Sequence, residues 1–197
     1  MPRWHPVLMV CAHEAEVETD LIGGALQCPA CAGRLGPWGH ARQRVIRGVG
    51  RLRPRRAKCR GCGRTHVLLP DTCLLRRRDV IAVIGAALLA RAAGRGHRTI
   101  AELLDLPKDT VRGWLRRFAR DAEAIRTLFS RWAFALDPEM GPVAPAGGVF
   151  ADVVSAIGVA MRAFVLRFGP QLEWSVVARL SGGVLLCHTS CPFPRVP

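Results

Sequence analysis

Four cysteines in the first third of the chain form two pairs, each with two residues between its members. Cys28 and Cys31 are the first pair, Cys59 and Cys62 the second, and 27 residues lie between the pairs. A Cys-x-x-Cys turn can aim two thiolates at one metal ion, and two such turns supply the four sulfur ligands of a tetrahedral structural zinc site. The spacing therefore predicts one structural Zn²⁺ bound by these four cysteines. A disulfide pair or unrelated thiols are the weaker alternatives.

The segment around these cysteines is too short to fold by burial of apolar side chains alone, so bound metal would supply the missing stability. We expect a zinc ribbon over residues 28–75, preceded by a short strand and helix extension over residues 1–27. Within the ribbon we expect strands at 42–47 and 51–58 around Gly48-Val49-Gly50. Trp38 is expected to pack beneath the ribbon rather than to stack on a base.

Cys11 and His13 are also metal-ligating residue types near the ribbon. Because the four later cysteines already satisfy the usual coordination of zinc, we expect instead a half-buried cysteine and a surface histidine.

Positive charge is concentrated in the same region. The formal net charge is +14, and the stretch from Leu21 to Pro70 contains eleven Lys or Arg residues and no Asp or Glu. Charge of one sign over such a stretch favours a polyanionic partner, and phosphates are the leading candidate over an acidic protein or a merely solvated face. The basic strand residues expected to contact DNA are Arg42, Arg44, Arg47, Arg51, Arg53, Arg55, Arg56 and Lys58.

A second unit follows the ribbon. Thr99 and Glu102 match a capping box at the start of a short helix, and Pro107 can set the start of the next helix. In that second helix the apolar positions Val111, Trp114, Leu115 and Phe118 share one face, which leaves a basic face exposed. Two short helices of this kind joined by a tight turn predict a helix-turn-helix within a domain spanning 76–136. The residues expected near DNA on the second helix are Lys108, Asp109, Thr110, Arg112, Gly113, Arg116, Arg117 and Arg120.

The remaining helices are read from their apolar periodicity. Asp79 is expected to cap a buried helix running to about Ala93. The helix that starts at Lys108 either continues to Leu136 or breaks near Arg120-Asp121. A C-terminal helical segment over 149–182 is expected to pack on the helical domain or to pair two copies of the chain, and we expect a disordered tail over 183–197. The predicted fold class is mainly α with a small β zinc ribbon.

The combination resembles the N-terminal DNA-binding region of insertion-sequence transposases, whose helix-turn-helix is homeodomain-like. The segment from Ile100 to Leu115 carries this likeness, with Asp105 where a turn glycine is usual. The motifs Cys28-Pro29-Ala30-Cys31, Trp38-Gly39-His40 and Thr110 to Phe118 are more closely similar to a zinc-ribbon plus helix-turn-helix family of high-GC bacteria. The resemblance covers about residues 6–136 and implies DNA binding without an established mechanism.

Catalysis is not expected. After the predicted helix-turn-helix six carboxylates remain, but they lie in a stretch that is short and helical rather than β-rich as a DDE nuclease domain requires, and the chain has no tyrosine for a tyrosine recombinase. We therefore expect a sequence-specific double-stranded DNA-binding protein that is transposon-associated. A host transcriptional regulator, or a zinc-ribbon adaptor for protein or RNA, is the alternative. A separately encoded DDE recombinase and a second copy of the chain are the further partners considered.

No secretory signal or membrane span is expected. The first 26 residues carry four acidic side chains and no continuous apolar core, and the run from Val80 to Ala90 is too short to cross a bilayer. Metal-spaced cysteines without such a signal indicate a cytoplasmic, nucleoid-associated protein.

Overall fold

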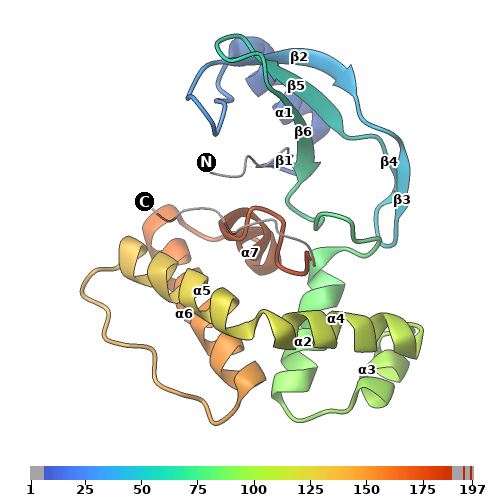
Figure 1. Cartoon of the computed structure of the whole chain (residues 1–197), viewed down its shortest axis with the longest axis vertical. Helices are drawn as coiled ribbons and strands as arrows, with labels where there is room; N and C mark the ends of the chain where they lie inside the picture. Colours follow the sequence, from blue (N-terminus) through green and yellow to red (C-terminus); the bar gives the residue numbers. More distant parts are fainter. Residues whose placement is uncertain (1–6, 188–192, 194–195, 197) are drawn as a thin grey trace.

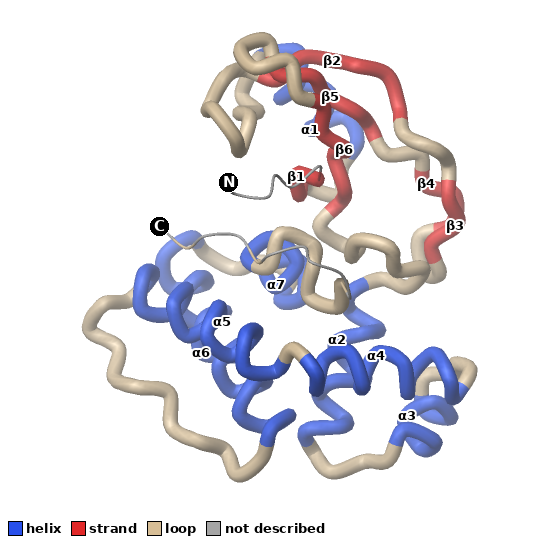
Figure 2. Tube along the Cα trace, in the orientation of Figure 1, coloured by secondary structure: helices blue, strands red, loops and turns tan. Residues whose placement is uncertain are grey.

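The computed structural model describes residues 7–187, 193 and 196, and these form a mixed α/β fold of helices and a small sheet (Figure 1). The strands and the first helix occupy one end of the longest axis of the molecule, and the other helices occupy the opposite end (Figure 2).

The four-stranded sheet has the order β1-β6-β5-β2 and contains Val7–Val10 (β1), Leu35–His40 (β2), Arg55–Cys59 (β5) and Thr65–Pro70 (β6). Strand β1 pairs in parallel with β6, and the other neighbours are antiparallel. Helix α1, Glu14–Gly23, packs Val17 and Leu21 into a small core with Leu35 and Leu68. The strand and helix predicted as an extension thus share the sheet and core of the ribbon.

A separate two-stranded hairpin lies beside this sheet. It pairs Arg44–Ile46 (β3) with Gly50–Leu52 (β4), around the predicted Gly48-Val49-Gly50 turn. Ile46 is buried, and the amide of Arg47 donates to the carbonyl of Arg78. The hairpin is therefore held against the segment that leads into the helices.

The helical part contains Ile81–Ala92 (α2), His97–Leu103 (α3), Lys108–Arg120 (α4), Ala122–Leu136 (α5), Val149–Phe168 (α6) and Glu173–Leu180 (α7). These helices share one continuous core that includes Ile84, Phe118, Phe129 and Ile157. Helix α7 approaches α2 closely because residue 85 is glycine: a Cβ atom there would lie 2.0 Å from the ring of Trp174.

The long amphipathic stretch after Lys108 is two helices. Asp121, at φ −101° and ψ 12°, interrupts the stretch between α4 and α5. Helices α5 and α6 then run along each other (Figure 1). Helix α6 therefore packs on the helical domain of its own chain, which was one of the two arrangements expected.

Two predicted caps are wrong. Helix α3 begins at His97 after Gly96, so Thr99 lies inside its first turn and does not cap it. Helix α2 begins at Ile81 after Val80, without a side-chain cap, and the buried carboxylate of Asp79 instead faces Arg47 at 3.3 Å. In both places the chain has a polar side chain that could cap a helix, but the helix begins at a different residue.

The predicted disordered tail is wrong for its first residues. Val184, Leu185, Leu186 and Cys187 are buried, and Leu185 and Leu186 belong to the helical core. Burial of these apolar side chains opposes the loss of chain entropy on ordering and favours a fixed position for this segment. The rest of the predicted tail, apart from Phe193 and Val196, lies outside the described residues.

The strand and helical parts are joined by specific contacts. The guanidinium of Arg179 on α7 donates to the buried carboxylate of Asp71, with 2.7 Å between Nε and Oδ2. The amide of Leu75 also donates to the carbonyl of Gly183 at 2.8 Å.

Among the described helices, α6 alone is long and apolar enough to cross a membrane by length and composition. Val153, Ile157 and Ala160 on one of its faces are buried in the helical core. One face of α6 therefore packs in the helical core, while Val149, Leu166 and Phe168 are exposed.

Candidate metal centre and nucleic-acid interface

The four cysteines of the two Cys-x-x-Cys turns come together at one end of the sheet. All their Sγ atoms lie within 4.8 Å of one another. Cys28 Sγ is 3.8 Å from Cys62 Sγ, and Cys31 Sγ is 3.5 Å from Cys59 Sγ. The thiols are free, so the disulfide alternative is not what the structure contains.

This geometry fits a tetrahedral metal ion. Four sulfurs at the usual Zn–S bond length of about 2.3 Å stand about 3.8 Å apart, which is close to the separations of these thiols. The tight turns leave little room for a side chain at Gly33, where a Cβ atom would lie 3.0 Å from Cys59 Sγ. The four residues could therefore hold one metal ion, and their sulfur donor set favours a soft or borderline ion.

The surroundings of the thiols already favour a thiolate. The backbone amide of Cys62 lowers the pKa of Cys59 to about 6. The amide of Gly33 acts in the same direction on Cys31, but hydrogen bonds with the thiols of Cys59 and Cys62 outweigh it and raise the pKa of Cys31 to about 11. A bound cation would therefore be needed to hold the Cys31 thiol deprotonated beside Cys59.

His66 is a neighbour of the cluster that the sequence analysis did not consider. Its Nε2 atom lies 3.4 Å from Cys28 Sγ, and burial lowers the pKa of the imidazole. In the tautomer with its proton on Nε2, the ring would donate to the Cys28 sulfur and orient it, as outer-shell groups do in metal sites. The alternation of buried residues along β6, with His66 two positions before Leu68, was the available signal.

A second group of potential ligands is formed by Cys11, His13 and Glu16, whose donor atoms also lie within 4.8 Å of one another. Cys11 is half-buried and His13 is exposed, as expected from the sequence. His13 faces the exposed carboxylate of Glu16 at 3.7 Å. Three largely solvated donors form a looser arrangement than the four-thiol cluster.

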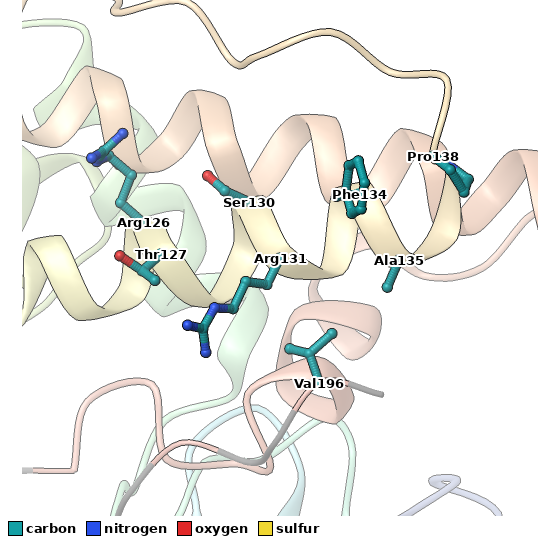
Figure 3. Close-up of a pocket in the computed structure, with 8 residues that line it drawn as sticks. All are labelled: Arg126, Thr127, Ser130, Arg131, Phe134, Ala135, Pro138 and Val196. Atoms are coloured by element: carbon teal, nitrogen blue, oxygen red, sulfur yellow. The ribbon is translucent and has the colours of Figure 1, made fainter.

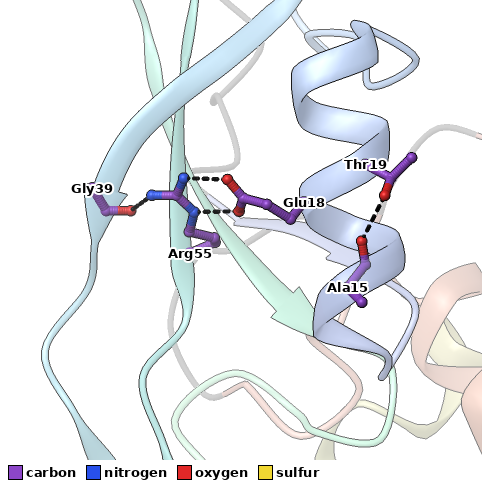
Figure 4. Close-up of polar contacts among 5 residues, drawn as sticks. All are labelled: Ala15, Glu18, Thr19, Gly39 and Arg55. Atoms are coloured by element: carbon purple, nitrogen blue, oxygen red, sulfur yellow. Dashed lines mark hydrogen bonds and ion pairs between the residues drawn. The ribbon is translucent and has the colours of Figure 1, made fainter.

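The basic residues predicted on the ribbon are not equivalent. Arg55 is held by a bidentate contact with Glu18 on α1, with 2.7 Å from Nε and 2.6 Å from Nη2, and it also donates to the carbonyl of Gly39 (Figure 4). The contact lowers the pKa of the Glu18 carboxyl. Arg55 therefore stabilises the ribbon, and its prediction as a DNA-contacting residue has no structural support.

Other cations of the ribbon also have internal contacts. Arg47 faces Asp79, Arg56 donates to the hydroxyl of Thr65, and Arg34 donates to the carbonyl of Gly23 at the end of α1. Arg42, Arg51 and Arg53 are exposed and have no ion-pair partner among the described residues. Arg44 is half-buried on the inner side of the hairpin, opposite Leu52.

Helices α3 and α4 form the second predicted unit and are joined by a four-residue turn. Asp105 in this turn has φ +50°, the left-handed conformation expected where its glycine counterpart would stand. Val111, Trp114, Leu115 and Phe118 are all buried, as predicted from the periodicity of α4. Ala101 is buried on α3, where a small side chain lets the helices approach.

The remaining face of α4 is basic. Lys108, Asp109, Arg112, Arg116 and Arg120 are exposed. Arg112 lies 3.2 Å from Asp109, and Arg120 pairs with Asp121, in solvated contacts of little energetic weight. Thr110, Gly113 and Arg117 are half-buried.

The absence of a side chain at Gly113 accommodates Arg117. A Cβ atom at Gly113 would lie 2.9 Å from Nη1 of Arg117. The guanidinium therefore lies along α4 rather than projecting straight from it.

Hairpin β3–β4 and the α3–α4 pair lie along the same side of the molecule in Figure 1. The exposed arginines of the hairpin and the basic start of α4 are separated in the sequence by more than fifty residues. Tertiary folding thus places two elements that carry exposed cations along one side of the molecule.

A groove of about 650 Å³ on α5 lies away from both of these elements (Figure 3). It is bordered by Arg126, Arg131, Phe134 and Val196, with the hydroxyls of Thr127 and Ser130. These side chains include no carboxylate, thiol or imidazole, so the groove offers no acid–base pair.

Trp38 does not pack beneath the ribbon, contrary to expectation. Its side chain is 50% exposed, and Nζ of Lys58 lies 4.3 Å from the ring centroid. His40 is exposed as well.

Comparison of this chain with protein-family models, with curated proteins and with solved structures found no match.

Proposed function

We propose that this chain is a zinc-dependent, sequence-specific double-stranded DNA-binding protein. The observation that carries the proposal is the α3–α4 pair, in which the four apolar residues of α4 are buried and its cations are left on the open face. A buried apolar face beside an open basic face supports a helix-turn-helix, in which the second helix would enter the major groove with its first residues near base edges.

In this arrangement Lys108 and Arg112 approach base edges and Arg116 approaches the phosphates. The exposed ribbon cations Arg42, Arg51 and Arg53 contact the neighbouring backbone and set the register of the protein on the duplex. Zinc bound by the four cysteines holds the ribbon in shape. The chain binds DNA without cutting it. This activity fits a transposon-associated role beside a separately encoded DDE recombinase, and it also fits autoregulation of the transposon.

The test is selection of bound duplexes from a random pool by the zinc-loaded full chain. We expect a recurrent site, and an affinity for it that falls steeply with salt because several phosphates are neutralised. Failure to bind any duplex at low ionic strength would end the proposal.

Substitution of Arg112 distinguishes DNA reading from an adaptor role of the ribbon. On the selected site, Arg112→Ala should cost about 1–3 kcal/mol and relax the sequence preference. The matched control is Arg131→Ala, which removes an exposed arginine of α5 and should leave binding unchanged. Equal losses on all sequences would reassign Arg112 to phosphate contact, and no loss would favour a ribbon that binds protein or RNA.

The genes that lie next to the bound sites distinguish a transposition role from that of a host transcriptional regulator. Target sites at transposon ends, next to a gene for a DDE recombinase, favour the first. Sites in promoters of unrelated genes favour the second.

A further inference from the structure

The exposure of Trp38 is built into the backbone of β2. Pro37 pairs with Ala57 and His40 pairs with Arg55, so two residues of β2, Trp38 and Gly39, face one residue of β5. Gly39 has φ +82°, as the extra residue of such a bulge often does. A β-bulge redirects a side chain, and here it directs the indole to solvent.

Trp38 forms one wall of a groove of about 470 Å³. The other lining residues are Gly36, Pro37, Lys58, Cys59, Arg60, Gly61 and Gly63, so the groove adjoins the second Cys-x-x-Cys turn. The groove contains two cations and one large aromatic surface, and its lining has no carboxylate.

The glycines keep this groove open. A Cβ atom at Gly36 would lie 3.3 Å from Nε of Arg60, so the missing side chain lets the guanidinium lie beside the strand. At Gly63, with φ +71°, no atom lies within 4 Å of a Cβ position. Nζ of Lys58 stands over the indole, 4.3 Å from the ring centroid, where it can interact with the ring or with an incoming anion, so a base would stack on the ring face that Lys58 leaves open.

An aromatic platform flanked by cations matches the chemistry of an unpaired nucleotide, whose base stacks on the ring while its phosphates meet the cations. A base inside an intact duplex is stacked on its neighbours and cannot lie on Trp38. An acidic peptide would satisfy Lys58 and Arg60 but would leave the indole without a matching flat partner.

We propose that the groove between Trp38, Lys58 and Arg60 binds an unpaired nucleotide on a DNA strand that continues beyond the duplex. This inference rests on the proposed function for the duplex contact. It assigns the far end of the ribbon to single-stranded or opened DNA, while the hairpin and α4 hold the double helix.

The experiment compares a 20-base-pair duplex with the same duplex carrying a six-thymidine extension on either strand, and with a twelve-thymidine single strand. The extension should raise the affinity of the zinc-loaded wild-type chain. Trp38→Ala should lower affinity for the extended duplex by about 5- to 150-fold, the range expected for loss of one stacked base, and should leave the blunt duplex unaffected.

Two variants serve as controls. Trp38→Phe keeps an aromatic ring and should retain most of the gain, whereas Arg53→Ala should weaken blunt and extended duplexes alike. Zinc content verifies that each variant retains the ribbon. Photocrosslinking of an extension that contains 5-iodouracil should label the peptide that includes Trp38.

The outcomes separate this inference from the duplex contact. No gain from the extension, equal losses on both duplexes, or binding of an acidic peptide at Trp38 in place of thymidine would overturn it, even with duplex binding intact. Trp38-dependent binding of the single strand without any duplex binding would support the groove as a site for an unpaired nucleotide and would contradict the proposed binding of duplex DNA.

Discussion

The helical part and the ribbon differ in how much apolar side chain each buries. The helical core runs from Leu74 to Leu186 and includes two fully buried phenylalanines, Phe118 and Phe129. The ribbon has two small clusters, and two cysteines of the candidate metal site, Cys28 and Cys59, are counted among the buried residues of one of them. We therefore expect a bound metal ion to stabilise the ribbon far more than the helices, because small cores cannot offset the entropy cost of ordering the chain.

The two parts also use charge differently. On α4 the exposed cations have at most solvated neighbours on their own helix. In the ribbon, by contrast, several arginines are tied to residues far along the chain, as Arg55 is to Glu18. Part of the positive charge of this small β unit is thus engaged in contacts that stabilise the unit itself.

The largest expected effect tests the dependence of the ribbon on metal. Cys31→Ser should reduce bound zinc from one equivalent to none and unfold the ribbon, because structural zinc in small domains contributes about 10–16 kcal/mol of apparent binding free energy. Metal analysis with hydrogen exchange should show lost protection in β2 and β5 but retained protection in α5 and α6. The matched control is Cys11→Ser, which lies outside the four-thiol cluster and should keep one zinc ion; retained zinc in Cys31→Ser would contradict the assignment.

The next effect tests the independence of the helical core. Phe129→Ala should cost about 3–5 kcal/mol of unfolding free energy, since the ring is fully buried and a cavity would remain. Phe134→Ala on the same helix removes the same ring from a side chain that is 61% exposed and should be nearly neutral. Denaturant unfolding of both variants measures the difference, and equal costs would mean that α5 is covered on its outer face as well.

A smaller effect separates the free and the engaged arginines of the ribbon. Arg53→Gln should weaken duplex binding and lower the salt dependence by about one phosphate contact. Arg55→Gln should leave the salt slope unchanged, because its guanidinium is already occupied by Glu18. Salt titrations of affinity give both slopes, and a larger change for Arg55→Gln would reverse this assignment.

The smallest effect concerns the Glu18–Arg55 contact itself. A double-mutant cycle of Glu18→Gln and Arg55→Gln should give a coupling of about 0.5–1 kcal/mol, discounted because the Glu18 side chain is 36% exposed. The lowered pKa of Glu18 means that this contribution is complete above the ordinary pKa of the carboxyl and is lost as the pH falls through the folded value. Titration of the Glu18 carboxyl by NMR should show its pKa returning toward the ordinary value in Arg55→Gln.

Local patterns in the sequence predicted much of the helical part and the metal ligands. The presence of helix within residues 149–182, the buried face of α4 and the left-handed Asp105 follow from periodicity and turn chemistry, which act over a few residues. The four cysteines were identifiable because ligand spacing within a turn is also local. Helix starts were less predictable, as Thr99 shows, because a capping residue is only one of several ways to begin a helix.

What the amino-acid sequence determined by itself was where the apolar faces and the thiols lie along the chain. Tertiary structure alone decided that β1 completes the ribbon sheet, that Val184 to Cys187 are buried, that Arg55 is engaged while Arg53 is free, and that a bulge directs Trp38 outward. The physical reason is that these outcomes depend on contacts between distant residues. Glu18 and Arg55 are 37 residues apart and Asp71 and Arg179 are 108 apart, so neither pairing leaves a local pattern in the sequence.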